Sequence, residues 1–327
     1  MTVTASWILT YFFHGLVCGS IVTALRLLPT GSVVRCRLMR LAIVAPFATS
    51  AIAIGVDGRA ALSVTPFTQN VDVRVIQKNG SPPVRIETRR DSLAATASSL
   101  IVLAAAIASS LGVLRFVLQR ARVARQLSTR VYCDAGRGLV STITTSDRVK
   151  VPVALRGGEV CVPSGFANLD VSEQRSVLLH ERAHITRKDP EWLDTTRAIA
   201  AVFWWQPFNI HVVRRLEIDS ELAADELALS TGADGPSLVR ALSQFAATLE
   251  RGSLTGAALI RHESPLIERA RLILDGAPPA RWDRVSLFLA MSATALLLLA
   301  PRVTAEWGTR APSTANRIVE ETNIVLR

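Results

Sequence analysis

Cysteine and aromatic residues are scarce in this 327-residue chain, which has four cysteines and only 6% Phe, Trp and Tyr. The cysteines lie far apart with no CxxC spacing, which argues against both a disulfide framework and a thiolate zinc site. Basic residues outnumber acidic ones by 37 to 27, but they are scattered around apolar blocks and are not interleaved with aromatics in one patch. Direct binding to nucleic acid is therefore not predicted.

Apolar residues, by contrast, are abundant: 49% of the chain is hydrophobic and the mean hydropathy is +0.31. Crossing the ~30 Å core of a bilayer takes ~20 mostly apolar residues in one helix, because lipid offers no partner to backbone polar groups. The sequence predicts a polytopic α-helical membrane protein with about four spans. They are residues 6–28, 38–56, 92–114 and 285–301. The first is expected to be a retained anchor, since neither a basic residue before it nor a clear cleavage site marks it as a signal peptide.

Charges beside the spans predict the topology, because short loops rich in Lys and Arg stay in the cytoplasm. Arginines crowd the first connection and the segment that leaves the third span, and the N-terminus carries none. They are Arg26, Arg35, Arg37 and Arg40, then Arg115, Arg120, Arg122, Arg125 and Arg130. We expect a multi-pass protein of the inner membrane with both termini outside. Residues 1–118 form a membrane domain, 119–284 a cytoplasmic domain, 285–301 the fourth span and 302–327 a short external tail.

The predicted cytoplasmic segment is mainly α with a small sheet, an α+β arrangement. Candidate strands cover 130–133 and 159–162, in a region where β-branched residues are broken by Gly and Pro. Asp170 and Glu173 have the spacing of a capping box and predict a helix start. Further helices are expected where Pro suits a first turn and Gly a stop. The expected helices are 171–188, 190–205, 208–230, 237–250 and 265–274.

The sequence His180-Glu181-Arg182-Ala183-His184 carries the chemistry. Histidines four residues apart on a helix project from one face and can share a metal ion, as in the HExxH motif of metalloproteases. Zinc accepts neutral imidazole nitrogens and lowers the pKa of a water in its open position. Glu181 is placed to take the proton of that water. The alternative without a metal is a pair of solvent-exposed histidines on a helix.

A third ligand is expected from the acidic helix downstream. Glu221 and Asp225 share a helix face, so one can bind zinc while the other orients a ligand histidine. Glu217 occupies the same face one turn earlier, and spacing alone does not separate Glu217 from Glu221. The alternative is a solvated acidic face that pairs with Arg214 and Arg215.

Four segments together resemble the BlaR/MecR family of membrane zinc metallopeptidases. They are His180 to His184, Arg187-Lys188-Asp189, Trp204-Trp205-Gln206-Pro207 and Glu221-Leu222-Ala223-Ala224-Asp225. The resemblance implies a zincin-like gluzincin site in a cytoplasmic loop between the third and fourth spans. It implies one Zn²⁺ on His180, His184 and Glu221, Glu181 as general base, and Asp225 as the residue that orients a ligand.

The chain departs from the family pattern at two positions near the site. Ala224 stands where Cys is common, and Trp205-Gln206 replaces the usual Phe-Asn; neither position is a metal ligand. A larger departure is that only about 26 residues follow Pro301, where the β-lactam sensors of this family carry a penicillin-binding domain. β-Lactam sensing is therefore not implied.

The expected function is regulatory proteolysis of a cytoplasmic protein, and family analogy points to a DNA-binding repressor encoded nearby. Three alternatives stay open: a non-catalytic membrane signal transducer, a heat-shock or CAAX-type membrane protease, and a site-two-type protease. The last rests on Leu274-Asp275-Gly276, which resembles a motif whose Asp is a metal ligand. The charged residues Arg182, Arg187 and Lys188 on the HExxH helix oppose it, because that class needs a lipid-spanning helix.

Overall fold

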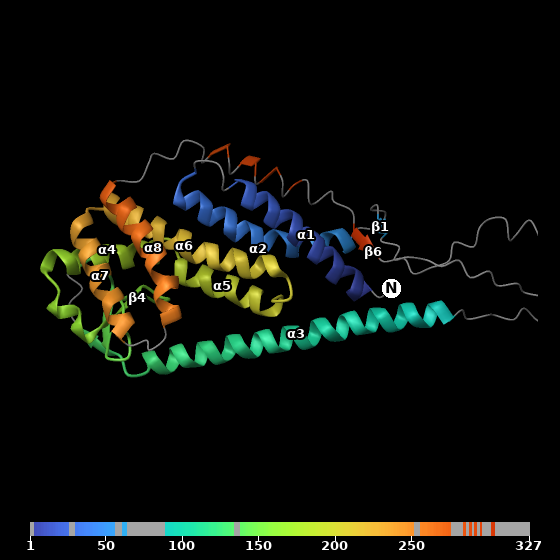
Figure 1. Cartoon of the computed structure of the whole chain (residues 1–327), viewed down its shortest axis with the longest axis horizontal. Coiled ribbons are helices and arrows are strands. Elements are labelled where there is room, and N and C mark those ends of the chain that lie inside the picture. The colour runs from blue at the N-terminus through green and yellow to red at the C-terminus, as the bar shows by residue number, and fades with distance from the viewer. Residues whose placement is uncertain are drawn as a thin grey trace, which may run out of the picture.

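The structure is a computed structural model that describes residues 3–25, 30–55, 61–63, 89–133, 138–251 and 256–275, with isolated positions between 284 and 304. Three long helices, α1 (Val3–Leu25), α2 (Ser32–Gly55) and α3 (Arg89–Leu127), stand beside a helical domain with a small sheet (Figure 1). Each is long and apolar enough to cross a membrane, over Thr4–Leu25, Ser32–Ala53 and Ser99–Leu127. Most of the predicted fourth span, 285–301, lies outside the described residues.

The second helix starts at Ser32, well before the expected position 38, and so carries basic residues that the hydropathy pattern placed in a connection. Two of these find carboxylate partners in the domain. Arg35 Nε lies 3.1 Å from Asp219, and Arg40 Nη2 lies 2.6 Å from Asp189. Because the charge of Arg35 is paired, the helix can begin earlier than apolar content alone predicts.

The domain contains a four-stranded sheet in the order β2-β3-β5-β4, formed by β2 (Val131–Cys133), β3 (Thr142–Ser146), β4 (Val153–Ala154) and β5 (Glu159–Pro163). β3 and β5 are parallel, with Ile143 opposite Val160, and the outer strands pair antiparallel to them. A separate parallel pair joins β1 (Ala61–Ser63) to β6 (Arg302–Thr304). β4 is an edge strand, and it lies against the helix that carries the two histidines.

Helices make up the rest of the domain. They are η1 (Ser164–Asn168), α4 (Val171–Thr186), α5 (Asp189–Val202), α6 (Pro207–Ser230), α7 (Gly235–Arg251) and α8 (Gly256–Asp275). The predicted capping box is present at the start of α4, where the Asp170 backbone N–H donates to Glu173 at 3.2 Å. Pro190 lies in the first turn of α5 as expected. Pro207, which was expected to separate two helices, is instead the first residue of α6. Gly232, with φ of 97°, follows the end of α6.

Two apolar cores hold these elements together. One joins the sheet to α4 and α7 through residues such as Ile143, Leu178 and Leu238. The other packs α2 directly on α6, where Leu38 and Ile43 meet Leu216. The helix that supplies the acidic residues of the site therefore rests on a candidate membrane span.

The turn between α5 and α6 lies among the three long helices and not on the domain surface. Trp204 Nε1 donates to the Ala108 carbonyl of α3, and Gln206 Nε2 donates to the Phe12 carbonyl of α1 at 2.9 Å. Asn209 donates to the Tyr11 hydroxyl at 2.9 Å. Side-chain N–H groups of Trp204, Gln206 and Asn209 are thus paired with the neighbouring helices.

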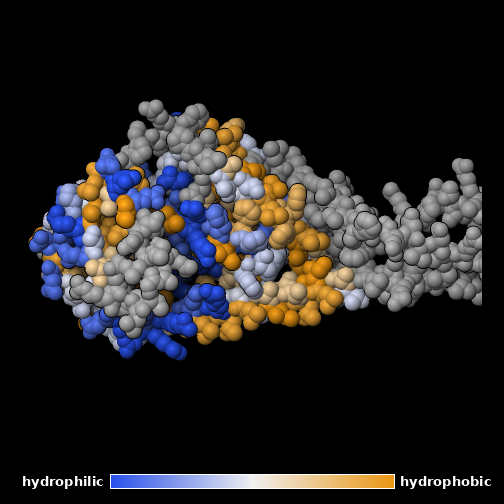
Figure 2. Space-filling view, in the orientation of Figure 1, coloured by the Kyte–Doolittle hydropathy of each residue, from blue (hydrophilic) through white to orange (hydrophobic). Residues whose placement is uncertain are grey.

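The surface divides in the same way. In Figure 2, apolar residues follow α3 and the part of the molecule around α1 and α2, whereas polar residues gather around a hollow in the domain. Side chains such as Leu100, Leu103, Ile107 and Leu111 on α3 are between 54% and 59% exposed. A band of this kind suits contact with lipid.

Candidate metal centre

Two helices bring three potential metal ligands together. On α4, the Nε2 atoms of His180 and His184 lie 3.1 Å apart. From α6, the carboxylate of Glu221 lies 3.6 Å from His180 Nε2 and 3.7 Å from His184 Nε2. One potential ligand atom from each residue lies within 4.8 Å of the other two. Among the described residues this is the only such group of three or more.

The remaining ring nitrogens lie beside carboxylates, an arrangement that fits a metal ion at the two Nε2 atoms. His180 Nδ1 lies 2.9 Å from Asp225 Oδ1, and His184 Nδ1 is hydrogen-bonded to Asp189 Oδ2 at 2.9 Å. A carboxylate on Nδ1 fixes a neutral ring in the tautomer whose Nε2 lone pair is free for a metal. Both Nε2 atoms point to the same place beside Glu221. Two nitrogens and one oxygen are a donor set that zinc accepts in catalytic sites.

Glu181, the next residue on α4, lines the same cleft and is only 6% exposed. Its carboxylate accepts a hydrogen bond from the backbone of Ala154 in β4, so the edge strand fixes its position. Burial raises the pKa of Glu181 above its usual range, and the neighbouring His180 and His184 only partly offset that effect. A carboxylate with a raised pKa is better suited to take up a proton and give it back near neutral pH.

Opposite charges stabilise the ionised forms around the site. Burial alone would lower the pKa of His180, but the carboxylates of Asp225 and Glu221 raise it to about 10. A metal ion at Nε2 must therefore displace a proton, since only the neutral ring is a ligand. Burial acts to raise the pKa of Glu221 and of Asp225, yet Arg269 and the histidines hold both below their usual range. The Glu221 side chain remains 41% exposed, towards the cleft, so its ionised carboxylate is accessible to a ligand.

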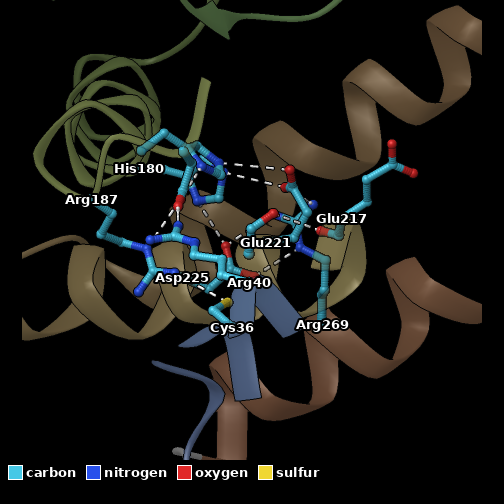
Figure 3. Close-up of polar contacts among 11 residues, drawn as sticks. Cys36, Arg40, His180, Arg187, Glu217, Glu221, Asp225 and Arg269 are labelled. Atoms are coloured by element: carbon cyan, nitrogen blue, oxygen red, sulfur yellow. Dashed lines mark hydrogen bonds and ion pairs between the residues drawn. The ribbon is translucent and has the colours of Figure 1, made fainter. Parts of the chain in front are cut away.

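Arg269 of α8 binds both carboxylates of α6 and was not identified from the sequence. Its Nη1 lies 2.9 Å from Glu221, and its Nε and Nη2 donate to the two oxygens of Asp225 at 2.8 and 2.9 Å (Figure 3). The fork geometry suits a carboxylate, so Arg269 fixes the Asp225 group that holds His180. No local pattern marks it, because α8 reaches α6 only through the tertiary fold.

The other acidic candidates lie elsewhere. Glu217 pairs with Arg197 of α5 at 2.7 Å and is not part of the three-ligand group. Asp275, the residue behind the site-two-type alternative, is exposed at the end of α8. The structure thus brings Glu221, and not Glu217 or Asp275, to the two histidines.

The metal centre opens into a large cleft with a volume of about 1830 Å³. Its walls come from the end of α3, from β4 and from helices α4 to α8, and include Phe116, Arg214 and Phe245. Pockets for small molecules usually measure ~300–1,000 Å³. This cleft has room for a polypeptide segment.

One comparison with known proteins gives a family. The family model described as BlaR1 peptidase M56 matches residues 38–271, from α2 to most of α8, a range that includes His180, His184 and Glu221. No curated protein matches the chain. The family match covers well over half of the sequence and implies a membrane-associated function of the metallopeptidase kind. The chain belongs to the BlaR1 peptidase M56 family.

Proposed function

We propose that this protein is a membrane-bound zinc metalloendopeptidase that cuts a cytoplasmic protein in a regulatory pathway. The observation that carries the proposal is the group of His180, His184 and Glu221, with Glu181 beside it at the wall of a cleft. Membership of a peptidase family supports the reaction class.

Each residue of the site has a role in this proposal. His180, His184 and Glu221 would hold one Zn²⁺, which supplies a Lewis acid that polarises a peptide carbonyl and lowers the pKa of a water. Glu181 takes a proton from the attacking water and passes it to the leaving amine. Asp225 keeps the His180 ring oriented, and Arg269 holds Asp225.

The proposed topology has four spans, with the metal centre in the cytoplasm and both termini outside. The N-terminal end of α2 contacts the domain through Arg35 and Arg40, and the C-terminal end of α3 contacts it through Arg120, which binds Asp194 at 2.8 Å. The basic ends of both spans therefore lie on the side of the metal centre. Excess Arg on short flanking segments favours the cytoplasmic side.

The proposed substrate is a protein, which the size of the cleft supports. By family analogy it is a DNA-binding repressor. The substrate can be identified by comparative proteomics of cells that carry the wild-type chain or an inactive variant. It is the protein with a new N-terminus that appears only with the active enzyme.

Two variants test the mechanism. Glu181→Gln removes the proton acceptor but no metal ligand, so we expect bound zinc at the wild-type level and no cleavage. His184→Ala removes a ligand, so we expect the metal to be lost together with cleavage. Zinc is measured on the purified protein by elemental analysis. A Glu181→Gln protein that still produces the new N-terminus contradicts the mechanism, and a wild-type protein with no zinc contradicts the metal assignment.

A further inference from the structure

Asp189 is a buried carboxylate that links one metal ligand to two arginines. Its side chain is 1% exposed. Oδ2 lies 2.9 Å from His184 Nδ1 and accepts a hydrogen bond from Arg187 Nε at 3.0 Å. Oδ1 accepts one from Arg40 Nη2 at 2.6 Å. The orientation of the His184 ring therefore depends on where Asp189 is held.

Arg40 belongs to α2, a candidate membrane span, and not to the domain. Its guanidinium lies 5.0 Å from the ring centroid of Trp192 on α5, which fixes the group from a second side. One turn earlier on α2, Cys36 Sγ accepts a hydrogen bond from Arg187 at 3.2 Å. The second helix thus contacts Asp189 directly through Arg40 and indirectly through Arg187. Figure 3 shows the contact between Arg187 and Cys36.

The same helix also contacts α6, which supplies Glu221. Arg35 Nε lies 3.1 Å from Asp219, and Ser32 donates a hydrogen bond to Glu226. The apolar faces of α2 and α6 pack against each other between these polar contacts. A single span therefore contacts both parts of the domain that provide metal ligands.

We propose that Asp189 and Arg40 are positioning residues of the metal centre, through which α2 sets the orientation of the ligand His184. The inference rests on the proposed zinc site and adds to it a route from the membrane to the metal. Asp189 keeps the Nδ1–H of His184 in place, so that Nε2 faces the metal position. Arg40 keeps Asp189 in place. A displacement of α2 along its axis moves the Arg40 guanidinium relative to Asp189 and changes zinc affinity.

The test measures the zinc Kd of the full-length protein in detergent, by competition with a chromophoric chelator. Loss of a partner that orients a ligand typically weakens metal binding by ~10–100-fold. We expect Asp189→Asn to fall in this range and Arg40→Met to lie near its lower end, at about 10-fold. The visible spectrum of the Co²⁺-loaded protein, which reports ligand geometry, should change in both variants.

The double variant is the decisive measurement. If Arg40 acts through Asp189, Arg40→Met adds no further loss in the Asp189→Asn background, whereas independent effects would add. Arg37→Met is the matched control, because Arg37 is exposed on the same helix and the change removes the same charge; its Kd should equal the wild-type value. Where Arg40→Met does not fold, Arg40→Lys replaces it and should give a Kd between those of the wild type and Asp189→Asn.

Two outcomes overturn the inference: a folded Arg40 variant with the wild-type Kd and Co²⁺ spectrum, or losses that add in the double variant. A wild-type protein that binds no zinc overturns the proposed function itself, and the inference with it. The two failures are therefore distinguishable from the wild-type titration alone.

Discussion

At the scale of single residues, each histidine of the site has an aspartate beside its Nδ1. The two aspartates differ in whether their role could be predicted from the sequence. Asp225 shares a helix face with Glu221, so spacing predicted that one of the pair binds metal and the other orients a ligand. Asp189 lies beyond the end of α4 and reaches His184 because Lys188, with φ of 55°, turns the chain back. No sequence pattern indicates that Lys188 adopts a left-handed backbone conformation, so the contact between Asp189 and His184 could not be predicted.

Lys188 therefore offers a residue-scale prediction. The left-handed region costs residues with a Cβ ~1–2 kcal/mol, and β-branched side chains tolerate it least. We expect Lys188→Ile to be less stable than the wild type, and less stable than Lys188→Gly by about 1–2 kcal/mol in free energy of unfolding. Lys188→Gly should leave it unchanged or raise it. Chemical denaturation in detergent measures both. Equal stabilities for the two variants would show that the φ of residue 188 imposes no cost.

The choice between Glu217 and Glu221 gives a second prediction at this scale. Spacing left both open, whereas the structure places Glu221 beside the histidines and pairs Glu217 with Arg197. Glu221→Gln should weaken zinc binding by more than the ~10–100-fold expected for an orienting partner. Glu217→Gln makes the same chemical change one turn away and should leave the zinc Kd unchanged. Equal losses in the two variants would contradict the assignment of Glu221.

At the scale of helices and strands, the sequence predicted elements whose boundaries are fixed locally. The Asp170–Glu173 capping box, Pro190 in a first turn, and Gly232 after a helix each act within a few residues. The early start of α2 was missed because it depends on Arg35 meeting Asp219, far away in the sequence. Burial of the α5–α6 turn was missed for the same reason. Contacts between distant elements leave no periodic pattern in the sequence.

The contact between α3 and the α5–α6 turn depends on a glycine. A Cβ on Gly112 would lie 1.9 Å from the carbonyl oxygen of Ala201 and 2.8 Å from Trp204 Cδ1. The backbone of Ala201 cannot move aside as a flexible side chain can. A larger residue at position 112 must therefore push α3 away from the end of α5. Close approach of helices at small residues is common in membrane proteins.

Gly112→Leu should therefore destabilise the protein by about 1–3 kcal/mol, the usual cost of overpacking. The melting temperature in detergent is expected to fall accordingly. Ala104→Leu, a change to the same residue at an exposed position of α3, is the control and should melt like the wild type. If both variants melt alike, α3 does not pack closely on Ala201.

At the scale of the whole molecule, the helices α1, α2 and α3 and the α5–α6 turn form one apolar body. The candidate metal centre lies at its boundary with the polar domain. The turn contacts α3 near Ala108 and Gly112, within the predicted third span. Irregular backbone at membrane depth is tolerated only when its polar groups are buried in protein. The side-chain amide nitrogens of Gln206 and Asn209 find such partners in the Phe12 carbonyl and the Tyr11 hydroxyl.

This arrangement predicts how deep the turn lies and on which side the domain stands. Val202, at the end of α5, is exposed and next to Ala201, whereas Ser243 is exposed on α7 in the domain. In a chain whose four cysteines are replaced by alanine, Ser243→Cys should react with a membrane-impermeant maleimide only in inverted vesicles. Val202→Cys should react in neither orientation, because lipid shields it; after denaturation in dodecyl sulfate both should react fully. Reaction of Ser243→Cys in right-side-out vesicles would show that the domain lies outside the cell. Reaction of Val202→Cys at the rate of Ser243→Cys would show that the turn is exposed to water.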